Sequence, residues 1–415
     1  MKPKNNRHFP RNWYIHAWGL WVAGLIVLSW LDRISVTIPH VGDLSLIIIA
    51  VSVGTYFMLL LTQRLKIKKN VLGIVTFLLV LILIYLIGDL YAPYKSLKSP
   101  VQIFLIALYF FGAIHIFRHN FVILLLANIW IGLALLHLGL WITKQFAYPF
   151  QGIFTHKNTL GSLISLGLYF ILAARMINRK FRWWWNIGLL ASLIVLFASG
   201  SRASWLLFAV AAMTYVLWPM ISARIWIAMS IFLLFISGII GFVFYYLELY
   251  QYNQFEELAR LVAQYTSQNL YSGRQNIWAS LIDHIHQHPW GLGPGATPER
   301  LLGIEFSAHN IYLQITLQVG FIGLITFIFL LTAIWIVLIT NKDDKIIRLT
   351  AGFFLGILVH QTFEVSLTQN NMIVGLVMWT VIAAGVGRAS FPIPVLQRWS
   401  NGFTLQKSKT ARERI

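Results

Sequence analysis

Two arginines and one histidine, each beside small polar residues, are the side chains of this sequence best suited to chemistry. Arg202 stands in the string SGSRASW, Arg274 in SGRQN and His309 in SAHN. A guanidinium binds phosphate oxygens with a planar, two-pronged geometry that lysine lacks. A neutral imidazole accepts a proton from a hydroxyl group near pH 7. If the fold brings the two arginines together, they predict a site for an anion such as a diphosphate.

Each of these residues also has a purely structural interpretation. Arg202 could extend from a helix end to lipid headgroups, and Arg274 could be a solvated residue in a first helical turn. His309 could cap the helix that follows it. Asn158 and Asn310 are of a type that commonly caps helices. The elements that carry these residues therefore matter as much as the residues themselves.

The composition places the candidates in a membrane protein. The chain has 415 residues, of which 58% are hydrophobic and 11% charged, and its mean hydropathy is +0.72. The apolar residues form runs of about twenty, which lipid forces into helices, and not the ten-residue alternation of a β-barrel. We expect an all-α, polytopic bundle of about twelve transmembrane helices, at 13–31, 44–62, 71–91, 100–117, 121–142, 159–176, 185–199, 203–219, 223–249, 310–340, 346–363 and 372–388.

The positive charge of the chain indicates topology and not a nucleic-acid partner. The net charge is +19, but the basic residues lie between apolar runs. Of the 32 lysines and arginines, 23 fall on the side of the membrane that holds the N-terminal tail and 9 on the other side. The positive-inside rule then makes both termini cytoplasmic and the candidate residues extracytoplasmic.

One connection is much longer than the rest. We expect four regions: transmembrane helices at 1–249, a long extracytoplasmic loop with amphipathic helices at 250–308, further transmembrane helices at 309–388 and a basic cytoplasmic tail at 389–415. Four helices descend from the outer surface beside the polar strings and near Glu364, and their N-termini present free N–H groups there. This surface suits an anion.

The residues present exclude some kinds of site. The sequence has no cysteine, so disulfides, thiolate metal ligands and a cysteine nucleophile are excluded. His284 and His288 would share one helical face, but the spacing indicates no third ligand. We therefore expect no metal and no cofactor.

Four strings, taken in order, resemble a known family. They are GIFTHKNTLG (152–161), SGSRASW (199–205), SGRQNIWASLIDHIHQHPWGLGPG (272–295) and AHNIYLQITLQVGFIG (308–323), and they resemble the O-antigen ligase and O-antigen polymerase superfamily of bacterial membrane proteins. The resemblance implies a metal-independent glycosyltransferase of the GT-C type that uses undecaprenyl-diphosphate-linked glycans outside the cytoplasmic (inner) membrane. It also implies that Arg202 and Arg274 bind the diphosphate and that His309 lies beside the reacting sugar.

We therefore expect a glycosyltransferase that polymerises repeat units of O-antigen, capsule or exopolysaccharide. Ligation of the glycan to lipid A core is the alternative, and a twelve-helix transporter or polysaccharide flippase is the rival from another class. The expected partners are the lipid-linked donor, a glycan or lipid-linked acceptor, the bilayer and polysaccharide assembly proteins, with no nucleic acid. His309 is the expected base, and Glu364 is the alternative base. The expected supporting residues are Asn158, Ser201, Asn310 and Glu364.

Overall fold

The computed structural model describes residues 13–30, 69–251, 274–304, 307–340 and 342–390, together with residues 260, 261 and 264. Within these ranges the chain forms helices and no strand, which confirms the all-α prediction. The helices are α1 (Trp13–Trp30), α3 (Lys69–Tyr91), α4 (Lys98–Ile116), α5 (Asn120–Thr143), α6 (Lys157–Ile177), η2 (Arg179–Phe181), α7 (Arg182–Ser199), α8 (Arg202–Ile221), α9 (Ile225–Gln251), α11 (Arg274–Gln287), α12 (Pro298–Leu302), α13 (Ile311–Ile339), α14 (Lys345–His360) and α15 (Met372–Ser390).

Among the described residues, nine helices are long and apolar enough to cross a membrane: α3, α4, α5, α6, α7, α8, α9, α13 and α15. The shorter helices α1 and α14 coincide with two more predicted spans. The chain is therefore a multi-pass membrane protein. The predicted span at 44–62 lies outside the described residues, so the count of twelve stays a prediction.

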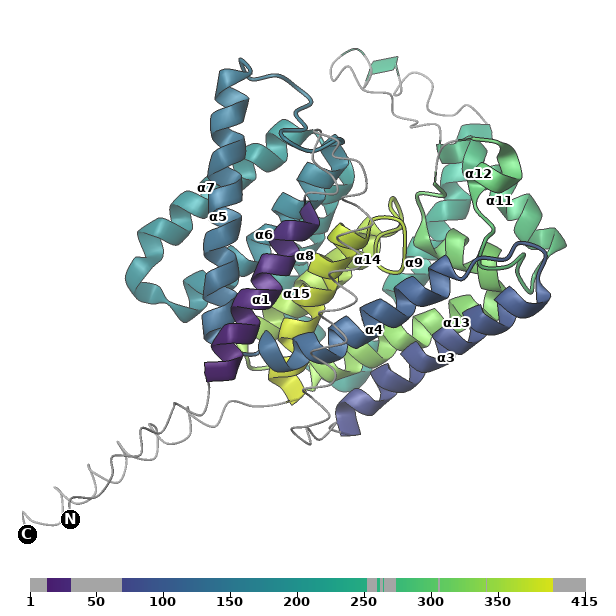
Figure 1. The fold of residues 1–415 in the computed structure, drawn as a ribbon, viewed down its shortest axis with the longest axis horizontal. Helices are drawn as coiled ribbons and strands as arrows, with labels where there is room; N and C mark the ends of the chain where they lie inside the picture. Colours follow the sequence, from purple (N-terminus) through teal and green to yellow (C-terminus); the bar gives the residue numbers. More distant parts are fainter. Residues whose placement is uncertain are drawn as a thin grey trace, which may run out of the picture.

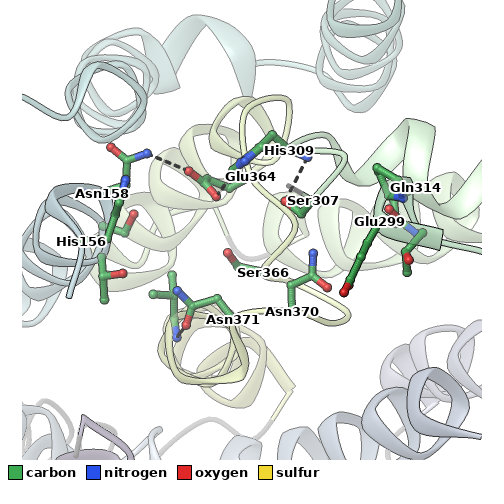
Figure 2. Close-up of a pocket in the computed structure, with 15 residues that line it drawn as sticks. His156, Asn158, Glu299, Ser307, His309, Gln314, Glu364, Ser366, Asn370 and Asn371 are labelled. Atoms are coloured by element: carbon green, nitrogen blue, oxygen red, sulfur yellow. Dashed lines mark hydrogen bonds and ion pairs between the residues drawn. The ribbon is translucent and has the colours of Figure 1, made fainter. Parts of the chain in front are cut away.

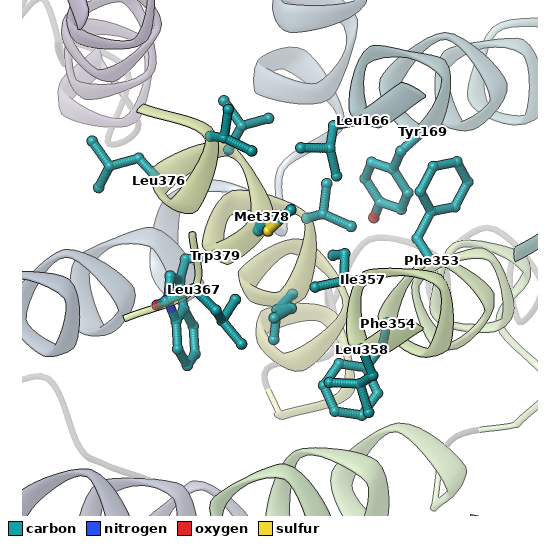
Figure 3. Close-up of a cluster of buried hydrophobic side chains, with 14 of the residues drawn as sticks. Leu166, Tyr169, Phe353, Phe354, Ile357, Leu358, Leu367, Leu376, Met378 and Trp379 are labelled. Carbon is teal, nitrogen blue, oxygen red and sulfur yellow. The ribbon is translucent and has the colours of Figure 1, made fainter. Parts of the chain in front are cut away.

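Helices α14 and α15 lie in the middle of the bundle (Figure 1). In the apolar 18-residue stretch of α15, 94% of the residues are buried inside the protein, against 28% in that of α9 at the edge. Side chains of α6, α14 and α15 pack together, with the rings of Tyr169 and Phe353 5.4 Å apart (Figure 3). These central helices position the loop that carries Glu364, because that loop joins the end of α14 to the start of α15.

The most extensive helix contact is between α8 and α14. Its closeness depends on two glycines of α14, because a Cβ atom at Gly352 would lie 2.5 Å from the carbonyl oxygen of Ala211, and one at Gly356 would lie 2.4 Å from that of Leu207. Small residues permit such backbone contact between membrane helices. The contact fixes the start of α8, and so Arg202, near the end of α14.

Helix α13 is broken at Val319 and Gly320, where Gly320 has a φ of +68° that favours glycine. Carbonyl groups freed by the break accept hydrogen bonds from the N–H groups of Leu292 and Gly293. Irregular backbone at membrane depth needs such partners. The turn-rich stretch before α12 is thereby held against the bundle.

Candidate active site

A polar cavity of about 520 Å³ lies where α6, α12, α13 and the loop between α14 and α15 meet (Figure 2). Figure 2 shows His156 and Asn158 on one side, Glu299 and Gln314 on the opposite side, and Glu364 and His309 between them. Most of its lining side chains are polar: His156, Asn158, Thr159, Ser162, Thr297, Glu299, Ser307, His309, Gln314, Glu364, Ser366, Asn370 and Asn371. We call it the polar cavity.

A second cavity, of about 190 Å³, holds both arginines and is called the arginine cavity. It is lined by Arg202, Ala203, Leu206, Tyr246, Arg274, Trp278 and Phe363. Nη2 of Arg274 lies 3.7 Å from Oε1 of Glu364, which lines the polar cavity. Cζ of Arg274 also lies 5.8 Å from the ring centroid of Phe363. Arg274 and Glu364 therefore form the boundary between the two cavities.

Glu364 connects the candidate residues of both cavities. Its Oε2 lies 3.5 Å from Nδ1 of His309. Its Oε1 accepts a hydrogen bond of 3.0 Å from the side-chain amide of Asn158. The contacts to His309 and Arg274 exceed ordinary hydrogen-bond lengths, whereas the contact to Asn158 does not. Glu364 is held in place mainly by a neutral amide.

The charge on Glu364 is set by its surroundings. Burial by itself would raise the pKa of this carboxyl group. The neighbouring His309, together with the charges of His360 and Arg274, outweighs burial and lowers the pKa to about 2. The carboxylate is therefore ionised at neutral pH. A group with so low a pKa is a weak proton acceptor.

Two further groups in this region have shifted pKa values. Burial lowers the pKa of His156, and the charge of Glu364 opposes that shift. Burial also lowers the pKa of Arg274, again opposed by Glu364, while the charge of Arg202 lowers it further. Arginine stays protonated in proteins. Two like charges beside one small cavity are an arrangement that a bound anion would stabilise.

The backbone at His309 is unusual for a residue other than glycine. His309 has a φ of +47°, and Asn370 across the cavity has a φ of +62°. This left-handed region costs a non-glycine residue roughly 1–2 kcal/mol. The next residue, Asn310, caps α13, and its side-chain oxygen accepts hydrogen bonds from the N–H groups of Tyr312 and Leu313. The strained turn and the cap together hold His309 at the cavity wall.

The structure distributes the predicted site residues over three places. Arg202 and Arg274 begin α8 and α11 and line the arginine cavity. Asn158, His309 and Glu364 line the polar cavity. Ser201 and Asn310 are buried and line neither cavity. His309 and Arg274 are linked through Glu364, which contacts both side chains. Arg202 lines the adjoining arginine cavity together with Arg274.

Some cavity residues were not anticipated from the sequence, namely Ser162, Glu299 and Gln314, together with His360 behind the wall. Ser162 is one helical turn after Asn158, so helical periodicity could have identified it. His360 bonds Ser162 across 198 positions, which no local pattern indicates. The described part of the chain contains no cluster of three or more His, Asp or Glu side chains able to hold a metal ion.

One comparison with known proteins found a match to part of the chain. A family model described as O-antigen ligase matches residues 187–328, from within α7 to within α13. The matched segment contains Arg202, Arg274 and His309. It confirms the resemblance seen in the sequence and supports the assignment of the chain to the O-antigen ligase and polymerase superfamily. No curated protein matched the chain.

Proposed function

We propose that this protein is a membrane glycosyltransferase that transfers an oligosaccharide from an undecaprenyl diphosphate carrier to an acceptor hydroxyl group. The observation that carries the proposal is the adjoining pair of cavities, one with two guanidiniums and the other with two histidines, two carboxylates, amides and hydroxyls. A sugar linked to a lipid diphosphate has an anionic part and a hydroxyl-rich part that match the two cavities. The family match supports the same class of enzyme.

The arginine cavity is the proposed place of the diphosphate. Arg202 and Arg274 offer paired N–H donors to phosphate oxygens. The remaining wall is mostly apolar, with Leu206, Trp278 and Phe363, and suits the first isoprenoid units of the carrier. The sugar attached to the diphosphate would then extend past Glu364 into the polar cavity.

The reaction is a direct displacement at the anomeric carbon. The acceptor oxygen forms a bond to this carbon while the bond from the carbon to the diphosphate oxygen breaks. The electron pair leaves with the diphosphate, whose charge the arginines stabilise. The acceptor proton passes to His309. Because Nδ1 of His309 faces the ionised Glu364, the tautomer with hydrogen on Nδ1 is favoured and Nε2 accepts the proton.

The acceptor distinguishes two activities. Polymerisation uses a second lipid-linked repeat unit, and we propose it as the reaction. Ligation to lipid A core is the second candidate, favoured by the description of the matching family model. Purified protein in nanodiscs would receive the lipid-linked repeat unit with or without lipid A core. A ladder from the lipid-linked unit alone supports polymerisation, and a product only with lipid A core supports ligation. No product with either acceptor contradicts the proposed enzyme.

We also propose that the cavities face the extracytoplasmic side of the inner membrane and that both termini are cytoplasmic. The absence of cysteine makes single-cysteine labelling clean. An impermeant thiol reagent on intact cells should label Arg300→Cys, an exposed position beside the polar cavity, and should not label Lys345→Cys at the opposite end of α14. The reverse labelling pattern would contradict this orientation.

A further inference from the structure

Ser162 and His360 form a pair that the reaction described above does not use. Ser162 lies on α6, one turn after Asn158, and lines the polar cavity. His360 ends α14 and is fully buried behind it. Oγ of Ser162 is 2.8 Å from Nε2 of His360. A buried histidine therefore bonds a hydroxyl group that forms part of the cavity wall.

Neighbouring hydrogen bonds determine which ring nitrogen of His360 carries the hydrogen. The side-chain oxygen of Gln361 accepts hydrogen bonds of 2.9 Å from the backbone N–H groups of Ser366 and Leu367. The amide nitrogen of Gln361 must then be the atom that lies 3.3 Å from Nδ1 of His360. An amide nitrogen only donates, so Nδ1 accepts and Nε2 carries the hydrogen.

This tautomer has a consequence for Ser162. Because Nε2 of His360 donates, Oγ of Ser162 accepts, and the serine's own hydrogen points elsewhere. Its other partner is Oγ of Ser204 at 3.5 Å, well beyond the usual length of about 2.7–2.8 Å between hydroxyl groups. Ser204 has a shorter contact of 2.8 Å with Ser201. The hydroxyl hydrogen of Ser162 is thus weakly engaged and free to turn to a ligand.

We propose that Ser162 is a substrate-binding hydrogen-bond donor, that His360 positions it, and that it binds an oxygen of the sugar next to the diphosphate. The inference rests on the proposed function and names the part of the substrate that the serine contacts. Glu299 and Glu364, which line the same cavity, disfavour phosphate and accept hydrogen bonds from sugar hydroxyls. The serine is one turn from Asn158, which bonds Glu364 at the boundary with the arginine cavity, so the first sugar is the nearest one.

Two probes separate sugar binding from diphosphate binding. Undecaprenyl diphosphate, and the same lipid carrying its oligosaccharide, would be titrated against the full-length protein in nanodiscs. Ser162→Ala should weaken binding of the glycan-bearing lipid about 3- to 10-fold, the effect of one net hydrogen bond, and leave binding of undecaprenyl diphosphate unchanged. Ser165→Ala is the matched control, because Ser165 is a buried serine of α6 that does not line the cavity.

Variants at His360 test its positioning role. His360→Gln keeps an N–H donor near the place of Nε2 and should bind both lipids almost as wild type does. His360→Leu removes the donor and should lose the same 3- to 10-fold for the glycan-bearing lipid. The double variant Ser162→Ala/His360→Leu should lose no more than either single variant, because both remove one interaction. Additive losses, or full affinity in His360→Leu, would overturn the positioning role.

The outcomes also distinguish this inference from the proposed function. If wild type binds both lipids and Ser162→Ala does so equally well, only the inference about Ser162 fails. If Ser162→Ala weakens binding of both lipids equally, the serine does not contact the sugar specifically, and the inference about Ser162 is overturned. If wild-type protein binds neither lipid, the proposed function fails and this inference fails with it.

Discussion

The two ends of α14 carry ionic clusters of different kinds. At its start, Asp344 caps the helix through the N–H groups of Ile346 and Ile347 and accepts a hydrogen bond of 2.6 Å from Nε of Arg388. Nη1 of Arg388 donates in turn to Asn120 of α5, at 2.9 Å. This cluster ties α5, α14 and α15 together with short, shared hydrogen bonds.

Just beyond the other end, Glu364 lies between His309 and Arg274 at 3.5 Å and 3.7 Å. These contacts leave donors and acceptors available beside two cavities. Burying a charge without strong pairing costs stability. Short, mutually satisfied ion pairs therefore serve the fold at the start of α14, whereas the looser pairs around the cavities leave polar groups available to a ligand.

The largest effect on the transfer rate is expected from replacing His309, the proposed base. His309→Ala should reduce transfer by roughly 10²- to 10⁴-fold, the range for a positioned proton acceptor, with binding of the lipid-linked donor almost unchanged. Single-turnover transfer in nanodiscs measures this. His156→Ala is the control, since His156 lines the same cavity and has no part in the proposed step. Wild-type rates in the His309→Ala variant would remove His309 from the mechanism.

Replacing the arginines should have the next largest effect. Arg202→Lys and Arg274→Lys keep the charge but lose the two-pronged hold on the diphosphate, and each should lose roughly 10- to 100-fold in kcat/KM. Arg300→Lys serves as control, because Arg300 is exposed outside the arginine cavity. Near-normal turnover in both cavity variants would reduce these arginines to anchors in the membrane surface.

Changes in the ionic cluster at the start of α14 should lower stability and leave transfer activity almost unchanged. Arg388→Leu should lower the free energy of unfolding by about 1–2 kcal/mol through the lost charge-assisted hydrogen bonds. Transfer activity per folded molecule should stay within about twofold of wild type. Thermal unfolding in detergent and the transfer assay measure the two quantities. A large loss of activity without a loss of stability would contradict the structural role of this cluster.

The pH dependence of stability tests the lowered pKa of Glu364. Its pKa is lowered to about 2 from an ordinary 4.5, so its stabilising contribution is present above pH 4.5 and is lost as the pH falls toward 2. The difference in unfolding temperature between wild type and Glu364→Gln should therefore shrink between pH 4.5 and pH 2. A difference that stays constant through this window would contradict the lowered pKa.

Part of this arrangement could be predicted from the sequence. The membrane helices follow from apolar runs, and Arg202, Arg274 and His309 follow from residue type within recognisable strings. The role of Glu364 as the link between the cavities was only partly visible, because it depends on the path of the loop after α14. Ser162 and His360 could not be paired in advance, since their contact requires the register of α6 against α14. Contacts between helices distant in sequence are determined by packing and not by any local pattern.

The most direct test of the account is the affinity for the glycan-bearing lipid measured together with the single-turnover transfer rate, in the same nanodisc preparations of His309→Ala and Arg274→Lys. If the two cavities divide the work as proposed, Arg274→Lys binds the lipid weakly, whereas His309→Ala binds it like wild type and transfers roughly 10²-fold more slowly or worse. Equal losses of affinity and rate in both variants would contradict the division between a diphosphate cavity and a reacting cavity.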